Sequence, residues 1–422
     1  MNPPSRPRRR ALLGVVAGAV LLPALLGGCS TSTPASPPTR DTPSAATQAD
    51  AGVPTPTPTA TATATPTPTA EPVDPVQAYA DARLATMTLQ QKIASMFMLH
   101  VPGTDPAVIR SFVDRYQPGG LILMGDNVPS PPEGLGALIP QFSSDSGLPL
   151  LVGIDQEGGI VRRIPTDTAP SARELRPEVP FATEESFSAR ADLLARLAVS
   201  INFGIVADQT ADTSSFIYSR VLGTTPQSAA DRVAAAVTGE KGTVLSTLKH
   251  FPGHGAAPGD SHSSIPASDI GLDEWRATHA VPFAAGIAAG AELVMTGHLR
   301  FSAVDELPAS LSPRWNSILR EELGFTGIVI TDDMRMLQDS GEPQFADAAA
   351  NTVAAIAAGN TMVMFVLPAD PASIGADPQH LVDAVAAAVA DGRLSEATIT
   401  DAARQLLVER RLLSGQTTPF AG

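Results

Sequence analysis

Residues 327–336 read Gly-Ile-Val-Ile-Thr-Asp-Asp-Met-Arg-Met. An unbroken apolar run of this kind is typical of a parallel strand that is covered on both faces. The run stops at two adjacent acids, Asp332 and Asp333, which are costly to hold beside a core unless they serve a function. Asp333 also suits a helix cap. The segment therefore predicts a buried strand whose carboxyl end carries chemistry.

Seven further segments repeat this pattern, with helix-like stretches between them. The expected strands are Ile93–Val101, Gly120–Met124, Leu150–Ile154, Ile201–Val206, Ser246–His250, Leu293–Thr296, Gly327–Thr331 and Thr361–Leu367. The expected helices include Ala189–Leu197, Ala229–Gly239, Pro282–Ala289, Ser312–Leu323, Ala346–Ala358, Leu381–Ala390 and Ile399–Leu413. Eight strands in one alternating series favour a single (β/α)8 barrel of the TIM type, with a doubly wound open sheet as the alternative.

Polar residues follow the strands where each one ends, which supports the barrel. They are Asp155, Asp208, Lys249, His250, His298, Asp332 and Asp333. One acid or histidine after a strand is often only a cap or turn residue. Five strands that end this way favour a functional rim, because a barrel carries its chemistry at the carboxyl ends of its strands.

A second stretch, residues 248–255, reads Leu-Lys-His-Phe-Pro-Gly-His-Gly, and Asp-Ser-His follows at 260–262. Side chains two residues apart in an extended segment point the same way, so Asp260 can accept a hydrogen bond from His262. The other imidazole nitrogen of His262 is then free to move a proton. A carboxylate such as Asp332 can attack an anomeric carbon.

A metal site is the alternative reading of the histidine-rich loop. Its candidate ligands are His250, His254, Asp260 and His262. Pro252 and the interleaved glycines give these side chains no regular ligand geometry, and we therefore expect neither a metal nor a cofactor.

These motifs resemble those of glycoside hydrolase family 3, and they fit best its β-N-acetylglucosaminidase subgroup. The resemblance is carried by residues 249–255 with 260–262, and by 331–334 with Met336. Residues 153–159 match the family's Asp-x-Glu-Gly-Gly segment, residues 294–298 match Val-Met-x-x-His, and residues 217–223 loosely match a segment that contains Arg220. The resemblance runs in order from about residue 78 to 412.

The resemblance implies a role for each matching residue. Asp332 would be the nucleophile, and His262 the general acid/base, paired with Asp260. The pocket for the terminal sugar would be lined by Asp155, Arg220, Lys249, His250 and Met336, with His298 nearby. The chain departs from the family at Ile160, where an Arg is usual, and at Ala256-Ala257, where Asp-Thr is usual. We expect these departures to alter contacts around the substrate rather than to abolish activity.

The implied function is that of a retaining exo-β-N-acetylglucosaminidase acting on peptidoglycan-derived GlcNAc–MurNAc fragments. About 90 residues follow Asp332, enough for the last strand and the closing helices, so both catalytic groups should lie in the barrel. A phosphorylase is one rival, because a histidine in place of a carboxylate repels an incoming phosphate less. A solute-binding lipoprotein is the rival from outside the enzymes.

Composition restricts the partners of the protein. Among 422 residues, 28 Lys and Arg stand against 43 Asp and Glu, for a net charge of −15, which argues against a nucleic-acid partner. The single cysteine, Cys29, excludes a disulfide framework. We expect a monomer whose partner is a carbohydrate substrate.

The N-terminus predicts export and membrane attachment. Basic residues up to Arg10 precede an apolar run from Ala11 to Gly28, as in a signal peptide. The run ends Leu-Gly-Gly-Cys, which resembles a bacterial lipobox, so Cys29 is the expected lipidation site; a plain secretory signal is the alternative. We divide the chain into a signal peptide at 1–28, a disordered Pro/Thr/Ser/Ala linker at 29–75 and a catalytic domain at 76–415. The expected location is the extracytoplasmic face of the cell membrane.

Overall fold

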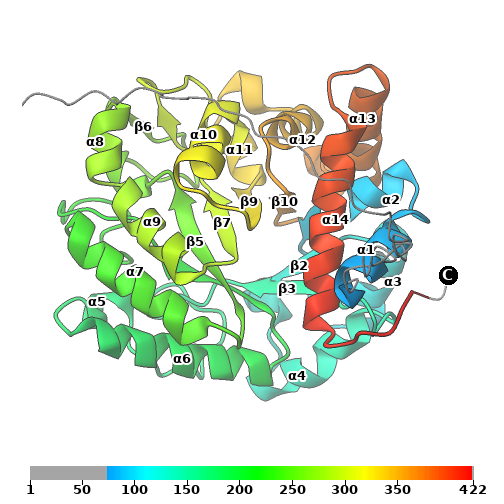
Figure 1. The fold of residues 1–422 in the computed structure, drawn as a ribbon, viewed down its shortest axis with the longest axis horizontal. Coiled ribbons are helices and arrows are strands. Elements are labelled where there is room, and N and C mark those ends of the chain that lie inside the picture. Colours follow the sequence, from blue (N-terminus) through cyan, green and yellow to red (C-terminus); the bar gives the residue numbers. More distant parts are fainter. Residues whose placement is uncertain (1–73, 421–422) are drawn as a thin grey trace, which may run out of the picture. The chain divides into compact units, whose positions relative to one another are not determined.

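A closed barrel of eight parallel strands forms the centre of the computed structural model, which describes residues 74–420 (Figure 1). The strands are β1 (Phe97–Leu99), β2 (Gly120–Leu123), β3 (Leu151–Ile154), β4 (Ile201–Val206), β5 (Leu245–Phe251), β7 (Leu293–Thr296), β9 (Ile328–Asp333) and β10 (Met362–Phe365). They follow the order β1-β10-β9-β7-β5-β4-β3-β2, and β1 pairs with both β10 and β2. This closure confirms the (β/α)8 barrel and excludes the open sheet.

The strand expected over Ile93–Val101 is wrong in its first half. Residues Leu89–Ala94 form helix α2, and only Phe97–Leu99 are extended. A capping box starts this helix just before the expected strand: the N–H of Gln91 donates to the Thr88 hydroxyl (3.2 Å), and the Gln91 side chain accepts from the N–H of Thr88 (2.9 Å). The other expected strands are present with small shifts of their ends.

Helices surround the strands on the outside of the barrel (Figure 1). Besides α2 they are α1 (Pro75–Leu84), α3 (Pro106–Tyr116), α4 (Leu135–Leu138), α5 (Ala172–Leu175), α6 (Pro180–Arg196), α7 (Pro226–Glu240), α8 (Leu272–Ala277), α9 (Ala280–Ala289), α10 (Pro313–Ser317), α11 (Arg335–Asp339), α12 (Ala348–Ala357), α13 (Pro378–Ala390) and α14 (Glu396–Leu413). Many begin with proline directly after a capping side chain; Asp105, for example, accepts the N–H of Ala107 at the start of α3. The expected helix Ser312–Leu323 is instead α10 followed by a π-helical turn, Ile318–Glu322.

The first and last helices close the fold beside each other. Figure 1 shows α1 and α14 side by side, and their exposed faces are joined by an ion pair between Arg404 and Asp81 (2.6 Å). Tyr79 and Leu407 meet Leu148 in a small apolar cluster under this contact. The chain segments before β1 and after β10 thus pack against each other, and β1 and β10, the first and last strands, pair directly.

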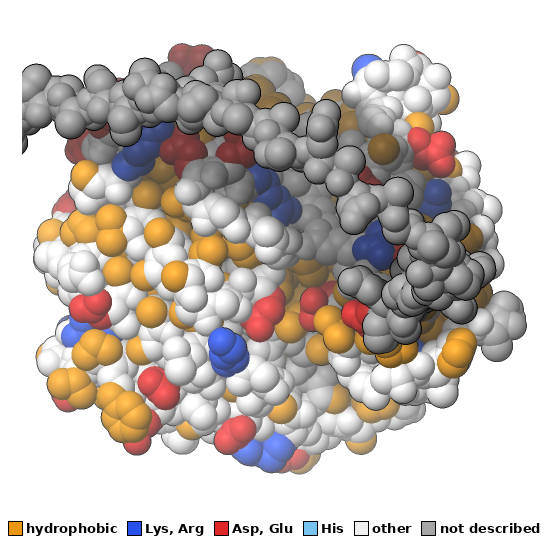
Figure 2. All heavy atoms as spheres, viewed as in Figure 1, with side chains coloured by type: hydrophobic (Ala, Val, Ile, Leu, Met, Phe, Trp, Pro, Cys, Tyr) orange, Lys and Arg blue, Asp and Glu red, His pale blue; other side chains and the backbone are white. Residues whose placement is uncertain are grey.

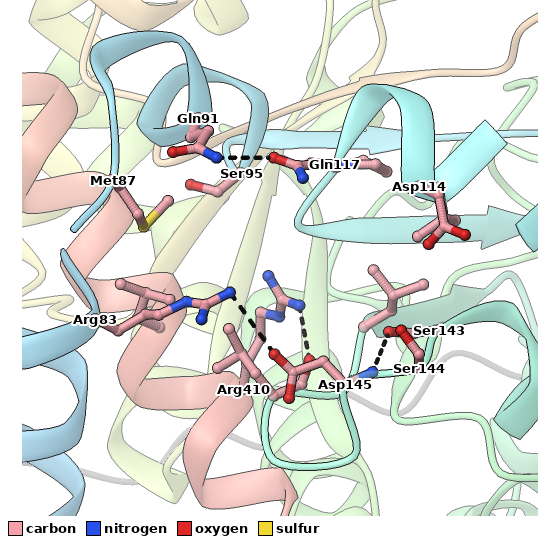
Figure 3. A pocket seen from close by; sticks show the side chains of 15 residues that line it. Arg83, Met87, Gln91, Ser95, Asp114, Gln117, Ser143, Ser144, Asp145 and Arg410 are labelled. Atoms are coloured by element: carbon pink, nitrogen blue, oxygen red, sulfur yellow. Dashed lines mark hydrogen bonds and ion pairs between the residues drawn. The ribbon is translucent and has the colours of Figure 1, made fainter. Parts of the chain in front are cut away.

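A polar cavity of about 300 Å³ lies among residues that precede β1, β2 and β3, at the amino ends of the strands (Figure 3). Its side chains are engaged with one another: Arg83 faces Asp145 (3.7 Å), and the Gln91 amide donates to Gln117 (3.3 Å). Arg410 donates to the carbonyls that precede β3. These contacts tie α1, α2, α3 and α14 together, and the amino ends of barrel strands are where such stabilising contacts are expected.

The surface in Figure 2 carries apolar side chains scattered among polar and charged ones over α7 and α9. Within residues 74–420, none of the helices combines the length and apolar character needed to cross a membrane. The expected signal peptide at 1–28, the lipidation site Cys29 and nearly all of the expected linker at 29–75 lie outside the described residues.

A buried acid at the end of α7 makes stability depend on pH. Glu240 is fully buried, and its carboxylate accepts from the Asn202 amide (2.5 Å). Burial raises the pKa of Glu240 to about 8, and the contacts with Asn202 and Ser246 offset burial only in part. The folded protein therefore keeps a proton on Glu240 that the unfolded chain releases near its ordinary pKa of 4.5. The stability that protonated Glu240 contributes is full below pH 4.5 and is lost as the pH rises through about 8.

Glu240→Gln should remove this pH dependence, because an amide does not titrate. Each pH unit between the two pKa values corresponds to about 1.4 kcal/mol, so the variant should be more stable than the parent by a few kcal/mol at pH 9. Urea unfolding at pH 5 and pH 9 measures the difference, with the exposed Glu133→Gln as the matched control. If the free energy of unfolding changed with pH equally in the parent and in Glu240→Gln, Glu240 would ionise freely in the folded protein.

Candidate active site

A cavity of about 390 Å³ opens at the carboxyl ends of the strands. It is lined by residues from the ends of β2, β3, β5, β9 and β10, from the loops that follow β3, β4 and β5, and from α11. Most of the residues predicted from the sequence meet here: Asp155, Arg220, Lys249, His250, His262, Asp332 and Met336. Asp333 lines the same cavity. The barrel thus brings together predicted side chains that are as far apart in the chain as Asp155 and Met336, a separation of 181 residues.

Asp332 lies near the end of β9 and is held as a carboxylate. Burial by itself would raise its pKa, but the N–H of Asp333, which donates to Oδ1 of Asp332 (2.8 Å), helps to bring the pKa below its ordinary value. Lys249 acts in the same direction. Asp332 is therefore ionised at neutral pH, as an attacking carboxylate must be.

Asp333, the next residue, is held in the opposite state. Burial raises its pKa to about 7, and the negative charge of Asp332 adds to this effect. The N–H groups of Val366 (2.9 Å) and Arg335 (3.2 Å) donate to its Oδ1 and oppose the rise. Two adjacent acids whose environments separate their pKa values are a recurring feature of catalytic sites. The arrangement favours Asp332 as the nucleophile and leaves Asp333 to bind the backbone of Val366 and of Arg335, the first residue of α11.

The Asp260–His262 contact is present, but the backbone is not extended as expected. Oδ1 of Asp260 accepts from both the N–H (3.0 Å) and Nδ1 (2.7 Å) of His262, within a turn at residues 261–263. Aspartate commonly binds the backbone two residues further on in such turns. Nδ1 therefore carries a proton, and Nε2 is the nitrogen left to exchange one with a substrate. The ring is 63% exposed and lines the cavity, so it is accessible to substrate.

A row of side chains with alternating charges forms one side of the cavity. Nζ of Lys249 lies 3.0 Å from Asp155 and 2.7 Å from Glu157, and Arg220 binds Glu157 through two nitrogens (2.7 and 2.9 Å). Burial would raise the pKa of Asp155, but Lys249 and Arg163 lower it to about 2. Burial would lower the pKa of Lys249, but Asp155 and Glu157 raise it. All members of this charged row are thus ionised, and they offer hydrogen-bond donors and acceptors to the hydroxyl groups of a sugar.

Asp208 holds His250 and the start of the histidine-rich loop in place. It is completely buried at the end of β4, accepts from Nδ1 of His250 (2.8 Å) and accepts from the N–H of His254 (2.6 Å). Burial would raise the pKa of Asp208, but His250 and His254 lower it. Nε2 of His250 accepts from Arg220 (3.3 Å). Asp208 therefore orients the imidazole ring of His250, which lines the cavity. Asp208 itself does not line the cavity.

His298 lies outside the set of residues that line the cavity. Its Nε2 donates to the carbonyl of Asp333 (2.9 Å), and its Nδ1 accepts from the Ser310 hydroxyl (2.7 Å). Burial lowers the pKa of His298, with Asp332 opposing. The structure therefore places His298 behind the end of β9, where it supports the backbone that carries both acids.

The candidate metal ligands are each bound to different partners. His250 contacts Asp208, Nε2 of His254 contacts the Ser261 hydroxyl (3.1 Å), and His262 contacts Asp260. Burial lowers the pKa of His254 to about 4, so that ring is neutral in the folded protein. Across the part of the chain that the structure describes, no three His, Cys, Asp or Glu side chains are arranged to hold a metal ion.

Glu157, Asp208 and Phe216 contribute to the site, although none of them had been given a role of its own from the sequence. Glu157 stood inside the Asp-x-Glu-Gly-Gly segment, and Asp208 stood at a strand end, so the sequence carried a signal for both. Phe216 had none, although its ring centroid lies 5.6 Å from those of both His262 and His254.

Comparison with known proteins assigns the family. The model of the glycosyl hydrolase family 3 N-terminal domain matches residues 88–408, well over half of the chain. A β-hexosaminidase from Methylococcus capsulatus is 33% identical over 263 residues, which are 60% of this chain and 77% of that protein. A β-hexosaminidase from Pseudomonas aeruginosa is 34% identical over 274 residues, covering 63% of this chain and 80% of that one.

Solved structures agree with this assignment. A glycoside hydrolase family 3 β-N-acetylglucosaminidase from Paenibacillus sp. has a TM-score of 0.70 at 28% identity, and the match covers 80% of this chain and 65% of that chain. A family 3 glycosyl hydrolase from Mycobacterium smegmatis has a TM-score of 0.67 at 28% identity, covering 78% of this chain and 98% of that one. The chain belongs to glycoside hydrolase family 3. It is a glycoside hydrolase, and the curated relatives support β-hexosaminidase activity.

Proposed function

We propose that this protein is a retaining exo-β-N-acetylglucosaminidase that removes terminal β-linked GlcNAc from peptidoglycan-derived GlcNAc–MurNAc fragments. One observation carries the proposal: a single cavity holds an ionised carboxylate, Asp332, together with His262, whose imidazole ring is oriented by Asp260 and whose Nε2 is left for a substrate. The similar structure from Paenibacillus is that of a β-N-acetylglucosaminidase, which supports the choice of sugar.

In the first step, a carboxylate oxygen of Asp332 forms a bond to the anomeric carbon while the bond to the leaving oxygen breaks. Nε2 of His262 gives its proton to that oxygen, since Nδ1 is already committed to Asp260. Loss of this proton leaves His262 neutral, whereas the protonated ring before the step is stabilised by the Asp260 carboxylate 2.7 Å away. The product is a glycosyl ester of Asp332 and a free aglycone.

In the second step, Nε2 of His262 takes a proton from a water molecule as that water attacks the anomeric carbon. The ester bond to Asp332 breaks, and the carboxylate is regenerated. Each displacement inverts the anomeric centre, so the sugar leaves with its original β configuration. The charged side chains of Asp155, Lys249 and Arg220 would hold the hydroxyl groups of the sugar in both steps. Met336 would pack against the apolar face of the sugar.

The test is turnover of a chromogenic GlcNAc β-glycoside and of the GlcNAc–MurNAc disaccharide, each with and without phosphate. Free GlcNAc at the same rate in both buffers is the expected result. Formation of GlcNAc 1-phosphate would show that the protein is a phosphorylase rather than a hydrolase. Absence of any turnover would favour a solute-binding protein. The chromogenic β-glucoside serves as the control for sugar specificity.

We further propose that the protein is monomeric and anchored to the cell membrane through Cys29, on the extracytoplasmic side. The Leu-Gly-Gly-Cys end of the apolar run and the Pro/Thr-rich segment behind it support the anchor. Cys29→Ala should move the protein from the membrane to the soluble fraction without changing its specific activity, and Ser30→Ala is the control. Recovery of Cys29→Ala in a salt-washed membrane pellet would contradict the anchor.

A further inference from the structure

A second cavity, of about 500 Å³, lies between α5 with the residues that follow it and the start of α7. Its charged lining residues are three arginines, Arg173, Arg176 and Arg232, and there is no Asp or Glu among the described residues that line it. Because α7 follows β4, this cavity is on the side of the barrel where the strands end. Three cations together are unexpected in a chain whose net charge is −15.

The positive charge of this cavity is not balanced by carboxylates. Within the described residues, the arginine ion pairs all belong to other arginines. Glu174 lies between Arg173 and Arg176 in the sequence, but its carboxylate accepts from the N–H (2.8 Å) and the hydroxyl (2.7 Å) of Ser171. Glu174 and Glu178 line a different cavity. The three arginines therefore create a local positive potential that attracts anions.

Two of the three guanidinium groups are held in place by neutral partners. Arg176 donates to the carbonyl of Tyr218 (3.1 Å), and its guanidinium lies over the ring of Tyr218, 4.5 Å from the centroid. Arg232 donates to the carbonyls of Leu175 (3.2 Å) and Arg176 (2.8 Å). Arg173 is exposed and has no hydrogen bond to another described side chain or carbonyl. Binding an anion here thus requires little reorganisation of Arg176 and Arg232.

The start of α7 adds to the attraction for anions. The helix has 15 residues, Pro226–Glu240, and its first turn is capped by the Thr225 hydroxyl, which accepts from the N–H of Ser228 (3.2 Å). Thr225 and Ser228 line the cavity, and so does Thr224. The amino end of a helix carries partial positive charge, and hydroxyl groups can donate to an oxyanion.

This cavity and the catalytic cavity share one short loop. Phe216 and Arg220 line the catalytic cavity, whereas Tyr218, between them, lines the arginine cavity. The N–H of Tyr218 donates to the carbonyl of Ser215 (3.0 Å) and that of Arg220 to the carbonyl of Ile217 (2.9 Å), so the loop is a compact pair of turns. The two cavities are therefore neighbours on the same rim of the barrel.

We propose that Arg173, Arg176 and Arg232 form an oxyanion site beside the active site, which receives a carboxylate carried by the aglycone of the substrate. A carboxylate and a phosphate present the same oxygen geometry to arginine, so a free phosphate is the other source of such a ligand. The shared loop favours the aglycone. The choice of the aglycone rests on the proposed function, whereas the oxyanion site itself does not depend on it.

Binding of inorganic phosphate tests the site without any catalysis. Titration calorimetry at constant ionic strength should show binding to the parent, and Arg173→Ala and Arg176→Ala should each weaken it about tenfold, as expected for loss of a charged hydrogen-bond donor. Arg173→Lys should retain more affinity than Arg173→Ala. Arg196→Ala is the matched control, because Arg196 is an exposed arginine of α6 outside this cavity. No binding to the parent, or affinity unchanged in both alanine variants, would overturn the site.

A pair of substrates tests the source of the anion. One is a GlcNAc–MurNAc fragment whose muramoyl unit carries an alanyl-glutamate dipeptide, and the other is the same fragment with both peptide carboxylates amidated. The parent should prefer the acidic fragment about tenfold in kcat/KM, and Arg173→Ala should bring the ratio near one through KM, with kcat and turnover of a chromogenic GlcNAc β-glycoside unchanged.

Equal kcat/KM values for the two fragments in the parent would overturn the aglycone as the source of the anion. Loss of phosphate binding in Arg173→Ala would then assign the site to a free anion. Absence of turnover of every glycoside would overturn the proposed hydrolase instead, and the phosphate titration would still decide whether the oxyanion site exists.

Discussion

Asp332→Gly should lose on the order of 10³-fold or more of its hydrolytic rate while the barrel stays folded. Asp332 is the ionised member of the acidic pair, and without it no covalent intermediate can form. The side chain packs at the open end of β9 and caps no helix, so its loss should leave thermal unfolding nearly unchanged. Initial rates on a chromogenic GlcNAc β-glycoside, with circular dichroism on the same samples, measure both effects.

Asp333→Asn is the matched comparison for this variant. Burial raises the pKa of Asp333 to about 7, and an amide has nearly the same shape as the protonated acid, so this change should cost much less activity below pH 7. Azide added to Asp332→Gly should form an α-glycosyl azide, because it can occupy the space of the missing carboxylate. Greater loss in Asp333→Asn than in Asp332→Gly would show that the nucleophile is misassigned.

His262→Ala should damage substrates with poor leaving groups about 10²- to 10⁴-fold more than those with good ones. An alkyl alcohol must be protonated as it leaves, and Nε2 of His262 is the nitrogen left free for that task. A nitrophenolate leaves without a proton, so attack by Asp332 should survive and release of the sugar from the ester should become slow. Paired kinetics on methyl and 4-nitrophenyl glycosides, with a search for a burst of nitrophenol, measure this split.

Asp260→Asn should act in the same direction but more mildly. The amide keeps the turn at residues 261–263, yet it removes the negative charge that stabilises the protonated ring. Equal losses for all leaving groups in His262→Ala, or recovery on addition of divalent metal, would make His262 a structural or metal-binding residue.

The barrel was predictable because its signal is local. Strands covered on both faces need apolar residues at every position, so each one stands out in the sequence as a continuous run. The error at Ile93–Val101 arose where this signal is ambiguous: a short apolar segment fits a strand or a buried helix. The capping box between Thr88 and Gln91 decided for a helix over Leu89–Ala94.

The site was predictable only in part, because its partners are distant in the chain. Lys249 and Asp332 lie near the carboxyl ends of β5 and β9 and could be found by position. The bond from Arg220 to Glu157 spans 63 residues, and the one from His254 to Asp208 spans 46, so no local pattern shows them. The opposite pKa shifts of Asp332 and Asp333 likewise depend on the burial and neighbours that the fold creates.

Proton NMR of the first-formed sugar tests the double displacement at Asp332 most directly. A GlcNAc β-glycoside is hydrolysed in the spectrometer, and the anomeric signal is followed before mutarotation mixes the two forms. Attack by Asp332 followed by attack of water predicts the β anomer first, with the α anomer growing in only at the rate of spontaneous mutarotation. The α anomer as the first product would show a single displacement by water and would contradict a covalent role for Asp332.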